Sequence, residues 1–339
     1  MPASGLFDND NRRIRYLRIS VTDRCNLRCR YCIPSSDFVC LLHSQVLTYE
    51  EIVRTARILA PYGVNSLRLT GGEPLVRKGL SHLVSSLASI PGIEDLSLTT
   101  NGILLKENAE PLRNAGLSRV NVSLDTLKPE KFRWITDPQA SGPSDNLTAV
   151  MDGLEAAHRA GLRPVKVNVV LMKGFNDDEL EDFAGLTLDR DWEVRFIEFM
   201  PMGPNGFWDR DKVITTAEIA SRLRRSFSGL EPLDRGKGSG PATRFRIAGH
   251  RGTVGFISPV SSHFCAVCNR LRLTADGKLR TCLFSDHETD IVPLLRGSAT
   301  DGEILKTIRD AIRKKPHGHG ITSDSIPSVC ARTMSHIGG

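Results

Sequence analysis

Short β-branched runs alternate with helix-length amphipathic stretches between residues 16 and 198, and no other feature limits the fold of this chain so strongly. Such alternation is typical of βα units around a parallel sheet. The predicted strands are residues 16–22, 66–70, 95–99, 119–123, 165–170 and 193–198. The predicted helices lie near residues 48–60, 79–89, 104–115, 146–160 and 177–188, and three of them are followed by a glycine where a left-handed cap would sit, at Gly63, Gly116 and Gly161.

The repeating βα unit ends near residue 200. Residues 201–206 are turn-rich and residues 229–240 are Gly-rich and polar, with a helix predicted between them near 216–226. Strand-like runs at 243–248 and 253–257 and a helix at about 301–314 follow. We therefore expect an α/β protein with an incomplete (βα)6 TIM-type barrel over residues 10–200. A C-terminal extension over residues 201–339 is expected to close the open side of the barrel.

The charge balance narrows the class of partner. The 45 basic and 39 acidic residues leave a net charge of 45 − 39 = +6, with no block of five like charges that would mark a nucleic-acid tail. Of the basic residues 33 are Arg, which grips carboxylate and phosphate bidentately, so a small anionic ligand is favoured over nucleic acid. No apolar stretch approaches the ~18 residues of a membrane span, and no targeting signal is visible. A cytoplasmic protein without a membrane partner is expected.

Eight cysteines without a visible signal peptide suit a reducing compartment, where clustered Cys more often bind metal or do redox chemistry than form disulfides. Six of them form two groups, C-x3-C-x2-C at Cys25, Cys29 and Cys32 and C-x2-C-x13-C at Cys265, Cys268 and Cys282. Each group is one ligand short of the usual four. The first group follows the first predicted strand, at the carboxyl end where (βα) barrels keep their chemistry.

Three thiolates on a four-iron cluster would leave one iron open, just as three protein ligands leave an open position on a catalytic zinc. By spacing alone, a zinc site completed by His43, or three unrelated thiols, is an equal alternative. The run Gly71-Gly72-Glu73-Pro74, at the end of the second strand, shifts the balance. Its glycines would let a ligand approach the backbone, and Glu73 could accept from an ammonium group, although these residues alone could form an ordinary turn.

Together these two motifs resemble the radical S-adenosylmethionine superfamily. The cysteine run reads CNLRCRYC, with an aromatic residue just before the third cysteine. The resemblance implies that Cys25, Cys29 and Cys32 hold a [4Fe-4S] cluster whose open iron binds S-adenosylmethionine. It also implies that Gly72 and Tyr31 lie beside the adenosylmethionine, whose reductive cleavage yields a 5'-deoxyadenosyl radical.

The second cysteine group has its own alternative, since His263 or His287 could complete a structural zinc site. The residues that follow argue against zinc, because Arg270 and Arg272 fall on one face of a predicted strand next to the thiols, before a turn at Asp276-Gly277. Arginines serve no obvious need beside a structural zinc. Beside an open cluster they could hold an anionic substrate.

A longer, ordered series of segments resembles one family within the superfamily, the GTP 3',8-cyclases of molybdenum cofactor biosynthesis. The matching segments are residues 18–22, 25–32, 67–74, 99–102, 121–126, 165–170, 195–203, 265–277 and 338–339. The resemblance implies a second [4Fe-4S] cluster on Cys265, Cys268 and Cys282. It implies GTP contacts by Arg18, Arg68, Thr99, Lys166, Arg270 and Arg272, and further adenosylmethionine contacts by Ser123 and Met200. No side chain beyond the cluster ligands is assigned a catalytic role.

The resemblance also implies a reaction and partners. The radical would remove the ribose 3'-hydrogen of GTP, and attack on C8 would lead to (8S)-3',8-cyclo-7,8-dihydroguanosine 5'-triphosphate. A reductant protein such as flavodoxin or ferredoxin would supply electrons, and cyclic pyranopterin monophosphate synthase would act downstream. The sequence leaves open which donor serves, whether the chain forms a homodimer, and whether the terminal Gly338-Gly339 enters the active site.

The chain departs from the family in three places: Ile33 replaces the usual Met before Pro34, and Cys40 and Cys330 are additional. None of these touches an implied ligand. Two other classes stay open from the sequence. A radical enzyme that modifies peptides could share the barrel and both cysteine groups, although such enzymes usually carry more C-terminal cysteines. A zinc-binding interaction module would leave residues 71–74 unexplained.

Overall fold

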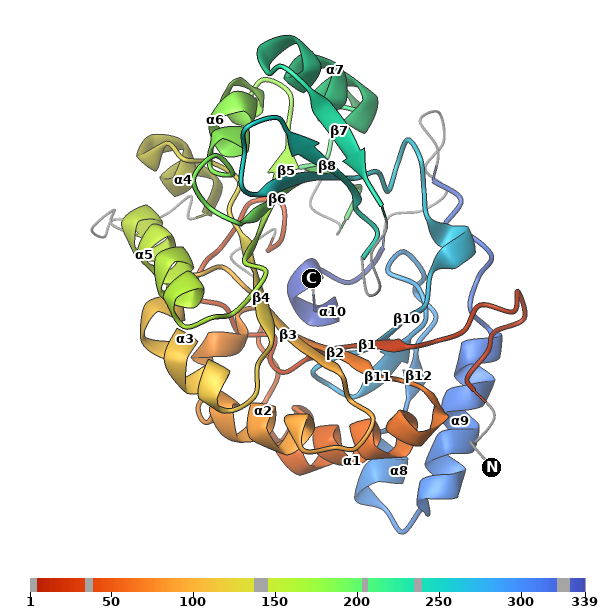
Figure 1. Ribbon diagram of the computed structural model, residues 1–339. Helices are drawn as coiled ribbons and strands as arrows, with labels where there is room; N and C mark the ends of the chain where they lie inside the picture. Colours follow the sequence, from red (N-terminus) through yellow and green to blue (C-terminus); the bar gives the residue numbers. More distant parts are fainter. Residues whose placement is uncertain are drawn as a thin grey trace.

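The computed structural model describes residues 5–33, 39–136, 146–202, 207–234, 240–321 and 330–338. Its strands form one twelve-stranded sheet in the order β12-β11-β10-β1-β2-β3-β4-β5-β6-β9-β8-β7. The eight central strands, from β10 to β9 in this order, run parallel to their neighbours, and the strands beyond them are antiparallel. The sheet curls around a central space, and helices cover its outer face (Figure 1).

The strands are β1 (Tyr16–Ser20), β2 (Ser66–Thr70), β3 (Asp95–Thr100), β4 (Arg119–Ser123), β5 (Lys166–Leu171), β6 (Glu193–Glu198), β7 (Leu230–Leu233), β8 (Thr243–Ile247), β9 (Thr253–Ile257), β10 (Arg270–Leu273), β11 (Lys278–Arg280) and β12 (Thr289–Asp290). The α-helices are α1 (Tyr49–Leu59), α2 (Leu80–Ala88), α3 (Leu105–Asn114), α4 (Pro129–Thr136), α5 (Asn146–Arg159), α6 (Leu180–Gly185), α7 (Thr216–Ser226), α8 (Val292–Arg296), α9 (Asp301–Arg313) and α10 (Met334–Ile337). None of the described helices is long and apolar enough to cross a membrane.

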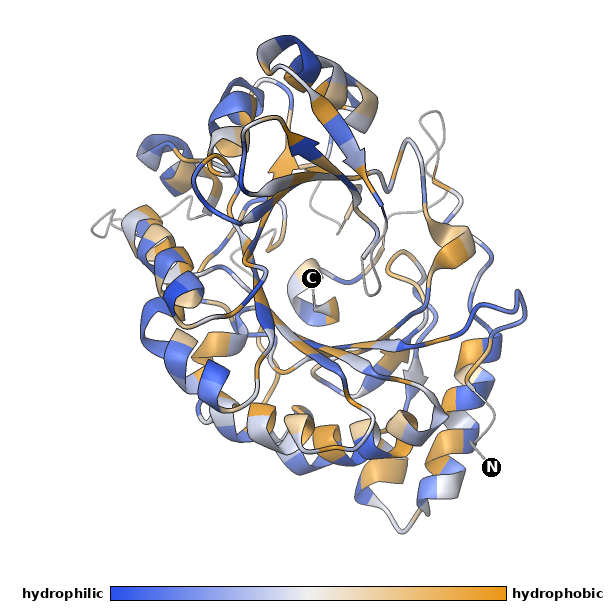
Figure 2. Cartoon of the chain, in the orientation of Figure 1, coloured by the Kyte–Doolittle hydropathy of each residue, from blue (hydrophilic) through white to orange (hydrophobic). Residues whose placement is uncertain are grey.

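Local sequence signals account for where several helices begin and end. Thr48 accepts a hydrogen bond from the Glu51 amide while Glu51 bonds back to Thr48, and capping boxes of the same kind begin α7 and α9. The predicted left-handed caps are confirmed, because φ is 95° at Gly63, 103° at Gly116 and 77° at Gly161. The outer helices carry hydrophobic and hydrophilic residues side by side in Figure 2, as helices with one buried face do.

The core lies between the sheet and the outer helices. Leu17 and Ile19 of β1 are fully buried in it, and Leu67 and Leu69 occupy the same place on β2. Since side chains alternate across a strand, the residues between them face the central space, and in β1 these include Arg18. The apolar outward set therefore fixes which polar residues line the interior of the barrel.

The predicted barrel elements are confirmed, with small differences at their ends. The strands β2, β4 and β6 match their predicted bounds, and β1 ends two residues early because the chain turns into the cysteine loop after Ser20. The stretch predicted as one helix over 177–188 divides into a 3-10 turn (Asp177–Glu179) and α6. The helix α4 was not predicted, and neither were the short elements β7, α8 and α10, because segments this short carry little periodicity.

The C-terminal extension does more than close one side. It places β10 beside β1 and β9 beside β6, both in parallel register, so it continues the barrel sheet at each edge. Among the described residues no pairing joins β7 to β12, so the sheet itself stays open. The C-terminal helix α10 lies in the space that the sheet surrounds (Figure 1). The expected division of the chain near residue 200 remains a prediction.

Candidate functional site

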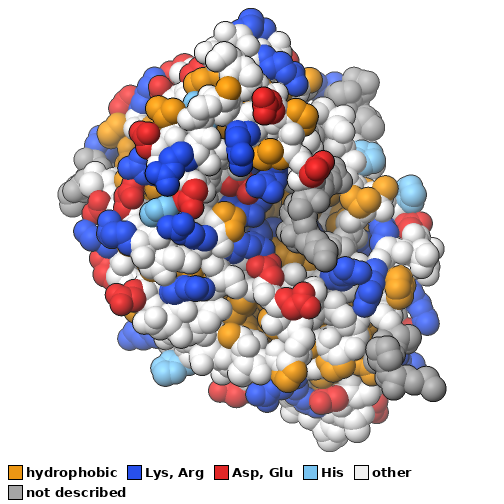
Figure 3. Space-filling model, viewed as in Figure 1, with side chains coloured by type: hydrophobic (Ala, Val, Ile, Leu, Met, Phe, Trp, Pro, Cys, Tyr) orange, Lys and Arg blue, Asp and Glu red, His pale blue; other side chains and the backbone are white. Residues whose placement is uncertain are grey.

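The inner face of the sheet carries a row of cations that the strand register brings together. Arg18 of β1 stands opposite Arg272 on one neighbouring strand and opposite Arg68 on the other. Arg68 in turn lies opposite Ser97, whose other partner is Arg119. Further cations lie on the same inward face, two or more residues along their strands. The whole set, called the row of cations below, comprises Arg270, Arg272, Arg18, Arg68, Arg119, Lys166 and Arg195. In the space-filling view, Lys and Arg side chains gather near the middle of the face of the molecule that is turned to the viewer (Figure 3).

Several polar atoms on this inner face are buried and have no hydrogen-bond partner. They are Arg18 Nε, Thr99 Oγ1, the Tyr16 hydroxyl, Asn121 Oδ1 and Asn168 Oδ1. Buried polar atoms are nearly always paired in native proteins, so a concentrated set of unpaired ones indicates a ligand site. These atoms are one guanidinium donor, two hydroxyls that can donate or accept, and two amide oxygens that accept. The charged groups on this face are mainly cations, which suits an anionic ligand.

The lowered pKa values of arginines in the row also indicate a site for an anionic ligand. Burial, together with the neighbouring Arg18 and Arg119, lowers the pKa of Arg68 to about 9 despite the opposing effect of Tyr16. Burial and the charges of Arg18 and Arg270 hold the pKa of Arg272 well below its usual range. Cations this close repel one another, so an anion of several charges would be strongly attracted to the row.

The first cysteine loop is fixed by the elements on both sides of it. The Arg28 amide donates to the Thr136 carbonyl at 2.8 Å and the Arg30 amide to Ile135 at 2.9 Å, which ties the loop to the end of α4. On its other side the Gly72 amide donates to the Thr22 carbonyl at 2.7 Å.

The two glycines of the 71–74 motif serve this packing. A Cβ on Gly71 would lie 2.5 Å from the Thr22 carbonyl oxygen, and one on Gly72 would lie 2.4 Å from that of Arg24. Their lack of a side chain therefore lets the motif meet the backbone of the cysteine loop, a close approach that was expected for a ligand. Glu73 is fully buried, and its carboxylate accepts from the Leu75 and Asn101 amides and from Thr100 Oγ1, so it ties the 71–74 motif to the end of β3.

The thiols of this loop lie close enough to influence one another. Burial raises the pKa of Cys29 well above its usual value, and the neighbouring Cys32 and Cys25 raise it further. Burial likewise raises the pKa of Cys32 to about 12. Three thiols gathered in one loop are the kind of ligand that a four-iron cluster needs, and a metal deprotonates the thiols that it binds. In the described part of the chain, no three Cys, His, Asp or Glu side chains gather around a position for one metal ion.

Of the predicted adenosylmethionine contacts, Tyr31 is held by Asp125, which follows β4. The Tyr31 hydroxyl donates to Asp125 Oδ2 at 2.6 Å, and the Val170 amide donates to Asp125 Oδ1 at 2.8 Å. Burial raises the pKa of Asp125 to about 6, and these two hydrogen bonds limit the rise. Asp125 therefore sets the position of the Tyr31 ring beside the cysteine loop.

The other predicted contacts at this end are Gly72, Ser123 and Met200. Ser123 is the last residue of β4 and lies opposite Asn168, while Met200 follows the end of β6. Met200 packs against a small cluster that contains Ile337 of α10. The structure thus places these residues at the carboxyl end of the barrel strands, where the cysteine loop also lies.

The second cysteine group lies at the edge of the row of cations. Cys265 begins a 3-10 turn (Cys265–Val267), Cys268 follows it, and Cys282 comes just after β11. Arg12 donates to the Cys265 carbonyl at 2.9 Å and holds this turn in place. Burial would raise the pKa of Cys268, but the charges of Lys315 and Arg270 outweigh it and lower the pKa. A thiol that is readily deprotonated fits a metal-cluster ligand.

The C-terminal tail enters the barrel. Arg272 Nη1 donates to the Gly338 carbonyl at 2.9 Å, and a Cβ on Gly338 would lie 2.5 Å from Thr70 Oγ1 and 2.8 Å from Ser20 Cβ. With φ at 81°, Gly338 also adopts a backbone conformation that favours glycine. The sequence left open whether the terminal glycines enter the active site. Gly338 lies inside the barrel, and Gly339 lies outside the described residues.

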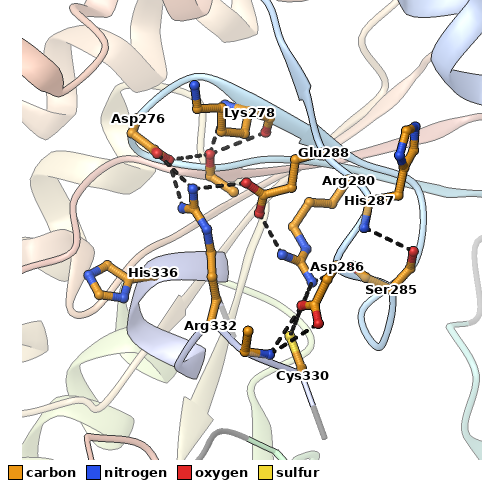
Figure 4. A network of polar contacts seen from close by, with 12 residues as sticks. Asp276, Lys278, Arg280, Ser285, Asp286, His287, Glu288, Cys330, Arg332 and His336 are labelled. Atoms are coloured by element: carbon orange, nitrogen blue, oxygen red, sulfur yellow. Dashed lines mark hydrogen bonds and ion pairs between the residues drawn. The ribbon is translucent and has the colours of Figure 1, made fainter. Parts of the chain in front are cut away.

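Salt bridges hold the start of the tail against the β10–β11 turn (Figure 4). Arg332 donates to both carboxylate oxygens of Asp276, at 3.0 and 2.9 Å, and pairs with Glu288 at 2.9 Å. Glu288 also accepts from the buried Arg280, at 2.5 Å. The additional Cys330 is buried beside this network, with its sulfur 3.1 Å from Arg280 Nη2. The other additional cysteine, Cys40, makes no contact with either cysteine group that the structure shows.

Residues that sequence reasoning missed are those whose role depends on register. Tyr16, Arg119 and Arg195 complete the row of cations and donors, and Glu193 is a buried carboxylate within it. One sequence signal could have found these residues: a charged or polar residue that lies between apolar residues along a predicted strand, because alternate side chains point to opposite faces of the sheet.

A partly open parallel barrel with three thiols in the loop after its first strand defines a radical S-adenosylmethionine enzyme. The comparisons agree: residues 19–187 match the model of the "Radical SAM superfamily", and residues 192–321 match that of "Molybdenum Cofactor Synthesis C". The chain belongs to the GTP 3',8-cyclase family, whose cofactors are S-adenosylmethionine and [4Fe-4S] clusters.

The family rests on relatives that match almost the whole chain. The GTP 3',8-cyclases of Thermodesulfovibrio yellowstonii, Moorella thermoacetica and Alkaliphilus metalliredigens are 50%, 48% and 44% identical to it. In each comparison 98% of this chain and 99% of the relative are covered. Among solved structures, Streptococcus suis SuiB bound to S-adenosylmethionine has a TM-score of 0.58 at 13% identity, covering 89% of this chain and 68% of that one, and shares the fold.

Proposed function

We propose that this protein converts GTP to (8S)-3',8-cyclo-7,8-dihydroguanosine 5'-triphosphate, the first step of molybdenum cofactor biosynthesis. The observation that carries the proposal is the row of inward-facing cations that spans the sheet, with the unpaired Arg18 Nε among them. A nucleoside triphosphate supplies the several negative charges that such a row attracts. Family membership supports the same substrate, since the relatives are named for GTP.

The two cysteine groups would hold the two clusters, Cys25, Cys29 and Cys32 the first and Cys265, Cys268 and Cys282 the second. Reductive cleavage of adenosylmethionine is the chemistry that the first cluster supplies in this superfamily. Tyr31, Gly72, Ser123 and Met200 would hold the adenosylmethionine. Their position at the carboxyl end of the strands, beside the first cysteine loop, supports this assignment.

The triphosphate would be held by Arg18, Arg68, Thr99, Lys166, Arg270 and Arg272. Their guanidinium, ammonium and hydroxyl groups face the interior, so the chain's own contribution is to orient the nucleotide and to exclude water from a reactive radical. Arg270 lies over the Phe264 ring with its guanidinium carbon 4.9 Å from the ring centre, which holds this side chain beside the second cysteine group.

Further proposals concern organisation and partners. We assign residues 10–200 to the barrel and residues 201–339 to the extension with the second cluster. A reductant protein such as flavodoxin or ferredoxin would deliver electrons, and cyclic pyranopterin monophosphate synthase would receive the product. We place the protein in the cytoplasm, where its thiols stay reduced.

An anaerobic assay tests the function directly. Reconstituted protein is mixed with GTP, adenosylmethionine and dithionite, and nucleotides are separated and identified by mass and fragmentation. The expected product is an isomer of GTP, formed together with an equal amount of 5'-deoxyadenosine. Iron analysis of the same protein should give about eight atoms, four for each cluster. Stoichiometric zinc with no more than four irons would refute the second cluster, and deoxyadenosine without a new nucleotide would refute GTP as substrate.

A further inference from the structure

Glu193 is a carboxylate on a face of the sheet that is otherwise dominated by cations. It is the first residue of β6 and only 3% exposed. Its register partner on β5 is Lys166, one of the proposed GTP contacts. Burying a carboxylate is costly unless it is paired, so its contacts indicate what it does.

Those contacts connect Glu193 to three cations from three strands. Oε1 accepts from Arg195 Nε at 2.5 Å, and Oε2 lies 3.7 Å from both Lys166 Nζ and Arg244 Nε. Arg244 comes from β8, and across β9 its register partner Gly255 is also the partner of Arg195. A single carboxylate therefore ties together the side chains at the β5, β6 and β8 side of the row.

Glu193 opposes the charges that act on Lys166. The groups that face this ammonium are Arg195 and Glu193 from β6, Arg119 from β4 and Arg68 from β2. Burial and the Arg195 charge lower the pKa of Lys166 to about 7, and Glu193 acts against them. Burial would raise the pKa of Glu193 itself, but Arg195 and Lys166 lower it overall, so the carboxylate is ionised at neutral pH.

We propose that Glu193 is a positioning residue for the nucleotide: it fixes the Arg195 side chain through Nε and pairs with the Lys166 ammonium, so that both cations are placed for contact with the triphosphate. The inference rests on the proposed function, because it takes GTP as the ligand. Glu193 contacts Arg195, Lys166 and Arg244, so the proposed effect is on the charge and orientation of these cations.

The sign of the pH effect follows from the cations. An anion binds the protonated Lys166 better, so GTP affinity should be highest below the pKa of Lys166 and should fall as the pH rises through it. Without the Glu193 charge, that pKa moves further down. The fall in affinity then begins at lower pH.

The experiment is equilibrium binding of GTP to anaerobic, cluster-loaded protein between pH 6 and 8.5. Glu193→Gln keeps the shape and removes the charge, and it should shift the pH midpoint of GTP binding down. Glu193→Asp keeps the charge and should hold the midpoint near that of the wild type. Lys166→Met should abolish the pH midpoint that Lys166 causes in GTP binding, leaving only the titration of GTP itself. In the double variant Lys166→Met with Glu193→Gln, the remaining pH profile should be the same as in Lys166→Met alone.

A matched control is Glu155→Gln, which breaks the ion pair of Glu155 with Arg190 outside the barrel. Its length of 2.6 Å is close to that of the pair between Glu193 and Arg195. Glu155→Gln should change neither affinity nor midpoint, and adenosylmethionine binding should be unaltered in every variant. If the wild type binds GTP and Glu193→Gln has the same pH profile, the inference is wrong. An equal loss of affinity for GTP and for adenosylmethionine at all pH values would also overturn the inference, because it would mean that Glu193 only stabilises the fold. Failure of the wild type to bind GTP would instead refute the proposed function.

Discussion

Removing the Arg332 guanidinium should release the C-terminal tail from the barrel without unfolding the protein. Arg332 makes two charge-assisted hydrogen bonds to Asp276 and an ion pair with Glu288, and its side chain is 26% exposed. A charge-assisted bond contributes ~1.5 to 3 kcal/mol, and exposed pairs contribute less. We therefore expect Arg332→Ala to weaken tail docking by about 2 kcal/mol, or roughly thirtyfold in the docking equilibrium.

Hydrogen exchange measures this docking at named amides. Ile337 and Gly338 donate to the Thr333 and Met334 carbonyls in the docked tail. Their exchange should rise roughly thirtyfold in Arg332→Ala while the barrel strands keep their protection. Burial raises the pKa of Asp276, but the bonds from Arg332 and Thr274 lower it overall. The stabilisation is therefore present at neutral pH and is lost as the pH falls through that lowered pKa.

A matched arginine serves as the control for this prediction. Arg313 pairs with Asp310 at 3.4 Å on the surface of α9, where the two side chains are 67% and 50% exposed. Arg313→Ala should leave tail exchange unchanged. Unaltered exchange at Ile337 and Gly338 in Arg332→Ala would refute the reasoning, and a uniform rise across the barrel would mean that Arg332 stabilises the whole fold.

Three further predictions concern the clusters and the substrate. Cys29→Ser should abolish adenosylmethionine cleavage. Cys268→Ser should end GTP cyclisation but keep adenosylmethionine cleavage that occurs without turnover of GTP. A normal rate of cyclised product in the Cys268 variant would make the second cluster merely structural. Arg270→Ala should weaken GTP binding roughly ten- to a hundredfold in equilibrium binding with adenosylmethionine binding unchanged, and unaltered GTP affinity would contradict its assignment. Tyr16→Phe removes a buried, unpaired hydroxyl surrounded by arginines, so it should weaken GTP binding about five- to tenfold at unchanged thermal stability; a stabilised variant with full affinity would show that the hydroxyl makes no contact with the ligand.

The sequence by itself determined the features that are local along the chain. The βα alternation gave the six barrel strands and their helices, because the period of apolar residues reports which face of each element is buried. The capping glycines Gly63, Gly116 and Gly161 were predictable for the same reason, since a helix end depends on a few adjacent residues. The two cysteine groups were also visible, because their members are close in sequence.

Tertiary structure alone decided which distant residues share the interior. Arg272 is 254 positions from its register partner Arg18, and nothing local to either segment specifies that β10 lies beside β1. Glu193 reads as an ordinary charge at the start of a strand until Arg195, Lys166 and Arg244 are placed around it. The glycines of the 71–74 motif and the docked Gly338 likewise acquire their roles from backbone that approaches from elsewhere in the chain. Register and long-range packing depend on the sum of all contacts in the folded state, whereas periodicity and spacing depend only on neighbours along the chain.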